Sequence, residues 1–243
     1  MRNWIEIDGK RSTEFGLRMA RLPLWTVAAE TVDTVEIAGV PVASDRHTGQ
    51  YQDFDLTLTG YLTRPQSPIE IAKLNEWIMH GKKLRLSTQP EMQGIIRSVG
   101  RIAPARIGTR ANEIQIPLTM QPFKVAYDNF AQSYSGEGCT IFNRGNVDCE
   151  PVYKLTFSDW SLAAYFDVNG ERLQLNPAAM DTGEAVIDLP RKKIYKVSGD
   201  TLTVVQRYTA GRFWAQVLKA GWNTLEWSSG ITAVEVTKNE RWL

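Results

Sequence analysis

Residues 54–62 read FDLTLTGYL, and every second position in this stretch is apolar, aromatic or glycine. Successive side chains of a strand point to opposite faces of a sheet, so the stretch predicts a strand with one apolar and one mostly polar face. The stretch IQIPLTM at 114–120 repeats the pattern, and IEI at 5–7 opens a short strand before an Asp8-Gly9 turn signal. This period of two predicts a mainly β protein.

One segment, residues 68–80, is predicted to be an α-helix. Ser67 and Glu70 flank a proline at the first helical position in the pattern of a capping box. Apolar residues then follow at spacings of three and four, which places them on one helix face: Ile71, Leu74 and Ile78, with Trp77 beside them. Gly81 is the expected stop signal.

The C-terminal half is predicted to be a β-sandwich, because short strand-like segments recur between turn signals. These segments are 140–143, 152–157, 164–168, 171–175, 184–188, 194–198, 202–208, 212–217, 222–227 and 231–237. The segment 121–137 interrupts the alternation and is predicted to be a linker. We therefore expect an N-terminal β-sandwich or split-barrel domain with one helix at 1–130, and a C-terminal sandwich domain at 131–243.

Composition and charge argue against several classes of protein. Lys and Arg number 28 and Asp and Glu 27, whereas a dedicated nucleic-acid binder shows a basic excess. No apolar run approaches the roughly 18 residues of a membrane span, and the N-terminus lacks the apolar core of a signal peptide. We expect no membrane insertion and no sequence-specific binding of nucleic acid.

The residue types that carry catalysis form no recognisable constellation. His47 and His80 share no metal-ligand spacing, and the nucleophile-elbow, Walker A and G-x-G-x-x-G motifs are absent. Asp53 and Asp55 lie on one strand face, where a solvated edge is favoured over a cation site. A solvated hairpin face is also favoured over contact with nucleic acid or an acidic partner for a run of four arginines: Arg97, Arg101, Arg106 and Arg110. We predict no enzyme activity, no metal site and no cofactor.

The only two cysteines, Cys139 and Cys149, are equidistant from Arg144. A hairpin turning at residues 143–146 would place them opposite one another, within disulfide reach. One interpretation is a close pair that stays reduced in the cytosol and oxidises later. The other is two separate structural cysteines, and the sequence favours neither.

Taken in order, these features resemble the distal tail protein family of long-tailed, non-contractile phages. The resemblance covers nearly the whole chain, and its order and spacing carry it rather than any single motif. The matching segments are IEIDGKRSTEFGL at 5–17, VEIAG at 35–39 with TGQY at 48–51, the helix leading into GKKLRLS at 81–87, NRGN at 143–146 followed by Pro151, NG at 169–170, GRF at 211–213, GWNTL at 221–225 and the final RW at 241–242.

The resemblance implies a fold and a role. Members of the family carry an N-terminal β domain whose six copies close into a ring, and a C-terminal galectin-like sandwich. The implied partners are further copies of the chain in a homo-hexamer, the tail tube protein and the tail-tip protein, with receptor-binding or baseplate proteins in some phages. The implied location is the virion tail tip, assembled in the cytoplasm of the bacterial host, with a lumen through which DNA passes.

The turn-rich segment AGVPVASDRHTGQY, residues 38–51, is predicted to be a loop. With the resemblance in mind, we predict that it contributes to the contacts between subunits. Its candidate residues are Val40, Pro41, Val42, Asp45, Arg46, His47 and Tyr51. The resemblance predicts a glycine-richer stretch where this chain has residues 40–42.

A carbohydrate-binding module is the alternative function. Five tryptophans lie in the C-terminal half, at 160, 214, 222, 227 and 242, and tryptophan serves both as core filler and as a stacking surface. We expect two or three of them in the core. Residues 131–243 contain no histidine and no Trp-Gly pair, so the sugar site of a true galectin is not expected here.

Overall fold

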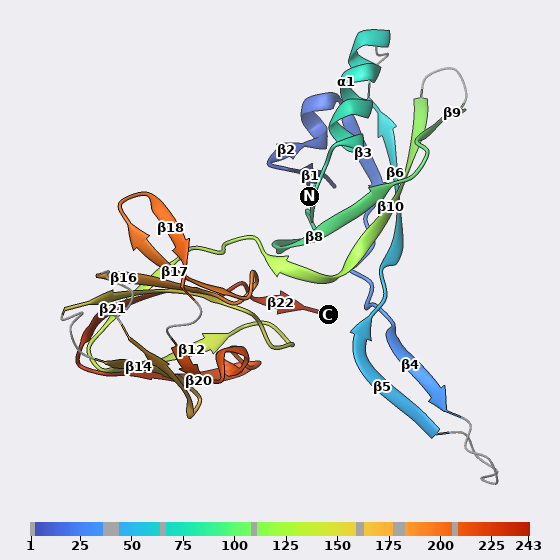
Figure 1. Cartoon of the computed structure of the whole chain (residues 1–243). Helices are drawn as coiled ribbons and strands as arrows, with labels where there is room; N and C mark the ends of the chain where they lie inside the picture. The colour runs from blue at the N-terminus through green and yellow to red at the C-terminus, as the bar shows by residue number, and fades with distance from the viewer. Residues whose placement is uncertain are drawn as a thin grey trace. The chain divides into compact units, whose positions relative to one another are not determined.

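The computed structural model describes residues 3–35, 44–63, 67–107, 111–158, 163–176, 183–205 and 209–243. The chain divides into two compact units, an N-terminal unit of Met1–Tyr127 with Leu243, and a C-terminal unit of Asp128–Trp242. Both units are built mainly of strands, so the predicted fold class is confirmed (Figure 1). No helix in the described ranges combines the length and hydropathy that a membrane span requires.

The N-terminal unit is built on one curled antiparallel sheet. Its order is β2-β1-β7-β8-β10-β6-β3, and β9 also pairs with β10. The predicted alternation is confirmed: Leu56 and Leu58 on β6 lie opposite Leu118 and Ile116 on β10, and all four are buried. The strands are β1 (Ile5–Ile7), β2 (Lys10–Arg11), β3 (Leu17–Arg21), β6 (Phe54–Leu62), β7 (Lys83–Leu86), β8 (Gln89–Val99), β9 (Ala103–Ile107) and β10 (Ala111–Ala126).

Helix α1 (Pro68–Met79) begins as the sequence predicts. The Glu70 backbone N–H donates to Ser67 Oγ at 3.3 Å, and the Ser67 N–H donates to Glu70 Oε2 at 2.8 Å, which completes the capping box. Leu74 and Ile78 are fully buried in the core of the unit. At Gly81 the backbone lies so close to the Ile7 side chain that a Cβ atom has no room.

Two stretches of the N-terminal unit differ from the prediction. Residues 44–51, predicted to be part of a loop, form strand β5 (Ser44–Tyr51), which pairs with β4 (Glu30–Val35) as a separate two-stranded ribbon (Figure 1). Residues 121–126, predicted to be linker, continue β10. Register shifts between Thr119 and Lys124 break the alternation there, because a bulge leaves residues unpaired with the partner strand.

The C-terminal unit is a two-sheet sandwich. One sheet has the order β11-β21-β13-β16-β17-β18, and the other has the order β12-β20-β14-β15-β19. Their strands are β11 (Gln132–Ser135), β12 (Gly138–Asn143), β13 (Val152–Phe157), β14 (Ala164–Val168), β15 (Glu171–Leu175), β16 (Glu184–Asp188), β17 (Lys193–Ser198), β18 (Thr201–Val204), β19 (Thr209–Gly211), β20 (Gly221–Trp227) and β21 (Ile231–Thr237).

The core of the C-terminal unit centres on three large aromatic residues, Trp227, Tyr153 and Phe166. Of the four tryptophans of this unit that the structure describes, only Trp227 lies in the core: Trp214 and Trp222 are exposed, and Trp242 is partly buried. Trp160 lies outside the described residues, so the expected number of two or three core tryptophans stays a prediction.

Residues 212–217 were predicted to form a strand, but residues 213–215 form a single 3-10 turn. The buried Gln216 side chain holds this turn through its amide N–H groups, which donate to the carbonyls of Glu171 at 2.8 Å and Arg212 at 3.2 Å. A buried polar side chain must find partners, and one partner of Gln216 is the carbonyl of Glu171 at the start of β15.

Candidate functional site

The β4–β5 hairpin contains most of the predicted assembly residues. Asp45, Arg46 and His47 lie on β5 opposite Thr34, Asp33 and Val32. Val40, Pro41 and Val42 lie outside the described residues. The predicted assembly residues that the structure describes therefore lie together on one strand of this hairpin.

Several contacts fix the base of this hairpin to the unit. Thr48 Oγ1 donates to the carbonyl of Thr31 at 2.7 Å, and the Gln52 N–H donates to the carbonyl of Ala29 at 2.9 Å. Tyr51 packs edge-on against Phe123 of β10, with ring centroids 5.6 Å apart. The last of the predicted assembly residues thus anchors the hairpin to the main sheet.

The segment 22–29, between β3 and β4, presents apolar side chains that sequence reasoning missed. Leu24 and Val27 are 70% and 66% exposed, while Leu22 and Ala28 are buried. The buried Lys124 holds this segment by donating from Nζ to the Thr26 carbonyl at 2.8 Å, and burial lowers the pKa of its ammonium group. Leu24 and Val27 are therefore two exposed apolar side chains on a segment that is held in place by a buried contact.

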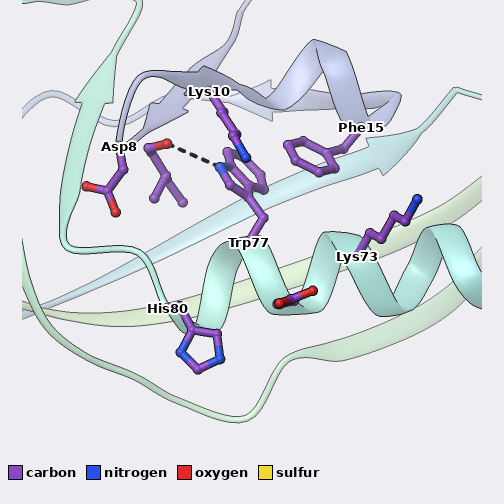
Figure 2. Close-up of a pocket in the computed structure, with 8 residues that line it drawn as sticks. Asp8, Lys10, Phe15, Lys73, Trp77 and His80 are labelled. Carbon is purple, nitrogen blue, oxygen red and sulfur yellow. Dashed lines mark hydrogen bonds between the residues drawn. The ribbon is translucent and has the colours of Figure 1, made fainter.

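A pocket of about 510 Å³ lies between α1 and the β1–β2 turn (Figure 2). Its floor is the Trp77 indole, which stacks on Phe15 with centroids 4.5 Å apart and donates from Nε1 to the Ile7 carbonyl at 3.2 Å. Asp8 accepts from the backbone N–H groups of Lys82 and Lys83, at 2.9 and 3.0 Å. These polar groups therefore fasten the turn to the end of the helix.

The rim of the same pocket carries Lys10, Lys73, Glu76 and His80. The structure places His80 here, exposed, as the C-cap of α1. No group of three or more His, Cys, Asp or Glu side chains in the described part of the chain is arranged to hold a metal ion.

The two aspartates at the start of β6 have partners on two other strands of the same sheet. Asp53 forms an ion pair with Arg97 on β8, with Nε to Oδ2 at 2.9 Å. Asp55 accepts from the Thr119 hydroxyl on β10 at 3.0 Å. The structure thus places these carboxylates in cross-strand contacts of the sheet surface.

The two cysteines lie in segments that pair with different parts of the chain. Cys139 on β12 is opposite Leu225 of β20, and Cys149 forms an isolated bridge with Leu218. The hairpin predicted around residues 143–146 is not formed: β12 pairs with β20, and Cys149 pairs with Leu218. Both thiols are free in the structure, and their pairing stays a prediction.

We expect both thiols to react slowly in the folded protein. Burial raises the pKa of Cys139 to about 11 and that of Cys149 to about 12, and the thiolate is the reactive form. At pH 8 Cys139 should react with a thiol reagent at least ~100-fold more slowly than free cysteine, and Cys149 only on unfolding. Kinetics with the wild type and a Cys139→Ser variant measure this. Absence of free thiols after unfolding without reductant would instead show a disulfide.

No family model and no curated protein matches this sequence. Among solved structures, the fold is that of a phage tail hub protein. In particular, the chain superposes on the SPP1 Dit (gp 19.1) protein with a TM-score of 0.72, over 100% of both chains and at 13% identity. That protein is described as a paradigm of the hub adsorption apparatus in phages that infect Gram-positive bacteria. The likeness confirms the distal tail protein fold that the sequence resembles.

Proposed function

We propose that this chain is a structural component of a phage tail tip. It forms a hexameric ring that links the tail tube to the tail-tip and receptor-binding apparatus, with a lumen that lets DNA pass. The observation that carries the proposal is the match of the whole fold, in both units, to a hub protein. The role is one of assembly rather than catalysis.

The surface of the N-terminal unit supports a ring. A ring needs two different patches on each subunit that contact one another around the axis. The β4–β5 hairpin is one candidate patch, and the exposed Leu24 and Val27 side chains are another. Both are attached to the same sheet, through Tyr51 on Phe123 and through Lys124 on Thr26, so each is presented by a rigid support.

The charge of the chain is consistent with a channel for DNA. The formal net charge is +1, and tight binding to DNA depends on neutralising many phosphates with Lys and Arg. A lumen protein with little excess positive charge lets DNA move past without holding it. The proposed location is the virion tail tip, with assembly in the cytoplasm of the host.

The oligomeric state of the purified protein tests this proposal. We expect light scattering to give a species of six chains of 27.4 kDa each, and negative-stain images of the same sample to show six-fold rings with an open centre. If the free protein is monomeric, the measurement is repeated with the tail-tip partner. A monomer that never joins such an assembly would contradict the proposal.

A further inference from the structure

The outer face of the second sheet of the C-terminal unit carries an ordered set of side chains. Strands β12 and β20 are paired so that Phe142 lies opposite Trp222, Thr140 opposite Thr224, and Gly138 opposite Glu226. These residues alternate with buried ones, such as Ile141 and Leu225. The three cross-strand pairs therefore form a row on the solvent side of the sheet.

The first pair in the row is an exposed aromatic platform. Trp222 is 73% exposed and Phe142 is 44% exposed, and their ring centroids are 5.0 Å apart. A cross-strand aromatic pair stabilises a sheet. That contact explains only the part of each ring that the other ring covers, and not the part that stays exposed. Most of the indole remains in water, although large aromatic side chains bring most stability when buried.

A pocket of about 490 Å³ follows along the same two strands and reaches Tyr165 on β14. Its lining includes the hydroxyl-bearing residues Thr140, Thr224 and Tyr165, and two carboxylates, Glu137 and Glu226. Gly138 leaves the floor open, and its backbone lies so close to the carbonyl of Leu225 that a Cβ atom would stand 2.7 Å from it. No ion pair joins Glu137 or Glu226 to a described residue.

We propose that this row of residues is a saccharide-binding face, which we call the β12–β20 face. A sugar ring presents an apolar C–H face, which packs on the indole of Trp222, and hydroxyl groups around its edge. The carboxylates accept hydrogen bonds from those hydroxyls, and charge-assisted hydrogen bonds of this kind are stronger than neutral ones. The threonine hydroxyls both donate and accept. This proposal does not depend on ring formation by the N-terminal unit.

The charges on the β12–β20 face select the kind of saccharide. Glu137 and Glu226 contribute two negative charges, while the nearby Arg172 stacks on Tyr165 at 4.0 Å and pairs with Asp167 at 3.6 Å. Charges in a binding site repel a ligand whose charge has the same sign. The ligand is therefore an oligosaccharide of neutral hexose or N-acetylhexosamine units, and not a glycan that carries uronate or phosphate groups.

The test uses the full chain on an array of neutral hexose and N-acetylhexosamine oligosaccharides together with uronate- and phosphate-bearing glycans. The tightest neutral ligand is then titrated by calorimetry. We expect Trp222→Ala to weaken its binding about tenfold or more, since a stacking surface is lost. Trp214→Ala is the matched control, because Trp214 is another exposed tryptophan of the same unit, 65% exposed and outside the row. It should bind as the wild type does.

A further variant tests the charge argument. Glu226→Gln keeps the size of the side chain and removes one negative charge, so signals from uronate-bearing glycans should rise severalfold. Both variants alter exposed side chains, and an unchanged melting temperature verifies that they fold. Equal loss in both tryptophan variants, binding of anionic glycans only, or binding of no glycan on the array would each overturn the proposal. In the last case, protection of Trp222 in assembled tail tips would assign the face to a protein partner.

Discussion

Replacing Glu240 by glutamine is expected to lower the free energy of unfolding of the C-terminal unit by about 3 kcal/mol at pH 7. The Glu240 carboxylate is 1% exposed. It accepts from the backbone N–H of Arg144 at 3.0 Å, from Arg144 Nε at 2.6 Å and from Lys238 Nζ at 2.9 Å. Removing the charge leaves two cations around a buried amide, and breaking a buried ion pair from one side is far more costly than losing a surface pair.

The loss should depend on pH in a definite direction. Burial by itself raises the pKa of Glu240, but the hydrogen bonds from Arg144 and Lys238 outweigh it and hold the pKa below the ordinary value of 4.5. A carboxyl whose pKa is lower in the folded state stabilises the fold above its unfolded pKa, and that contribution is lost as the pH falls through the folded pKa. The difference between wild type and Glu240→Gln should therefore shrink below pH 4.5.

Urea unfolding with pulse labelling of Cys149 measures this effect in the right unit. Cys149 is fully buried there, so in a Cys139→Ser background its labelling reports unfolding of the C-terminal unit alone. Asp128→Asn is the matched control: Asp128 pairs with the same Arg144 at 3.0 Å but is 49% exposed, and it should cost only about 0–1 kcal/mol. Equal costs for the two variants would show that the burial of Glu240 does not decide the effect.

Local patterns predicted the elements whose stability depends on nearby residues. The helix begins at Pro68 because Ser67 and Glu70, which are three residues apart in the sequence, form a capping box. The strands Ala164–Val168 and Glu171–Leu175 join through a short turn, in which Asn169 takes the left-handed conformation that such a turn requires. The information for these elements is contiguous in the chain.

Elements that depend on distant partners were predicted less well. The turn-rich stretch at 44–51 is a strand only because β4 lies beside it, and strand propensity yields readily to such pairing. The run at 212–217 has the apolar spacing of a strand, but the buried Gln216 ties it to the carbonyl of Glu171 instead. Residues 121–126 continue β10 through a bulge, which a search for strict alternation rejects.

The candidate sites were the hardest to read from the sequence. Trp222 and Trp227 lie on the same strand and differ in burial from 73% exposed to 1% exposed, because an odd spacing puts them on opposite faces of β20. Which face is buried depends on the second sheet, and no local pattern identifies it. The cysteine hairpin failed for a related reason, since the partner of β12 comes from residues 221–226, far along the chain.

Shortening the β4–β5 hairpin is expected to abolish ring assembly while leaving both units folded. Deletion of residues 42–48 would remove Thr48, whose hydroxyl holds the base of the hairpin at Thr31, and so would mix loss of contacts with loss of structure. A better variant replaces residues 33–46 by Asn-Gly. Val32 and His47 are cross-strand partners, and a two-residue Asn-Gly turn is the favoured connection between such a pair.

The expected effect is large because the removed ribbon carries five of the seven predicted contact residues. The two removed residues whose burial the structure describes, Asp33 and Thr34, are both exposed. If the hairpin supplies the central contacts of the interface, its loss should raise the concentration needed for rings about 100-fold or more. Light scattering and negative-stain images measure assembly, and circular dichroism with thermal melting verifies that the β content is retained. Normal six-fold rings from the shortened variant would show that the interface lies elsewhere, with Leu24 and Val27 as the next residues to change.

A hairpin of the C-terminal unit offers the matched control. Lys196 and Thr203 are cross-strand partners on β17 and β18, which join through a tight turn at Gly199 and Asp200. Removing residues 197–198 and 201–202 shortens that hairpin by two pairs and keeps the same turn residues. Since the ring is proposed to form through the N-terminal unit, this variant should assemble normally. Loss of rings in both variants would mean that shortening any hairpin prevents assembly. It would contradict the prediction that β4 and β5 form the interface.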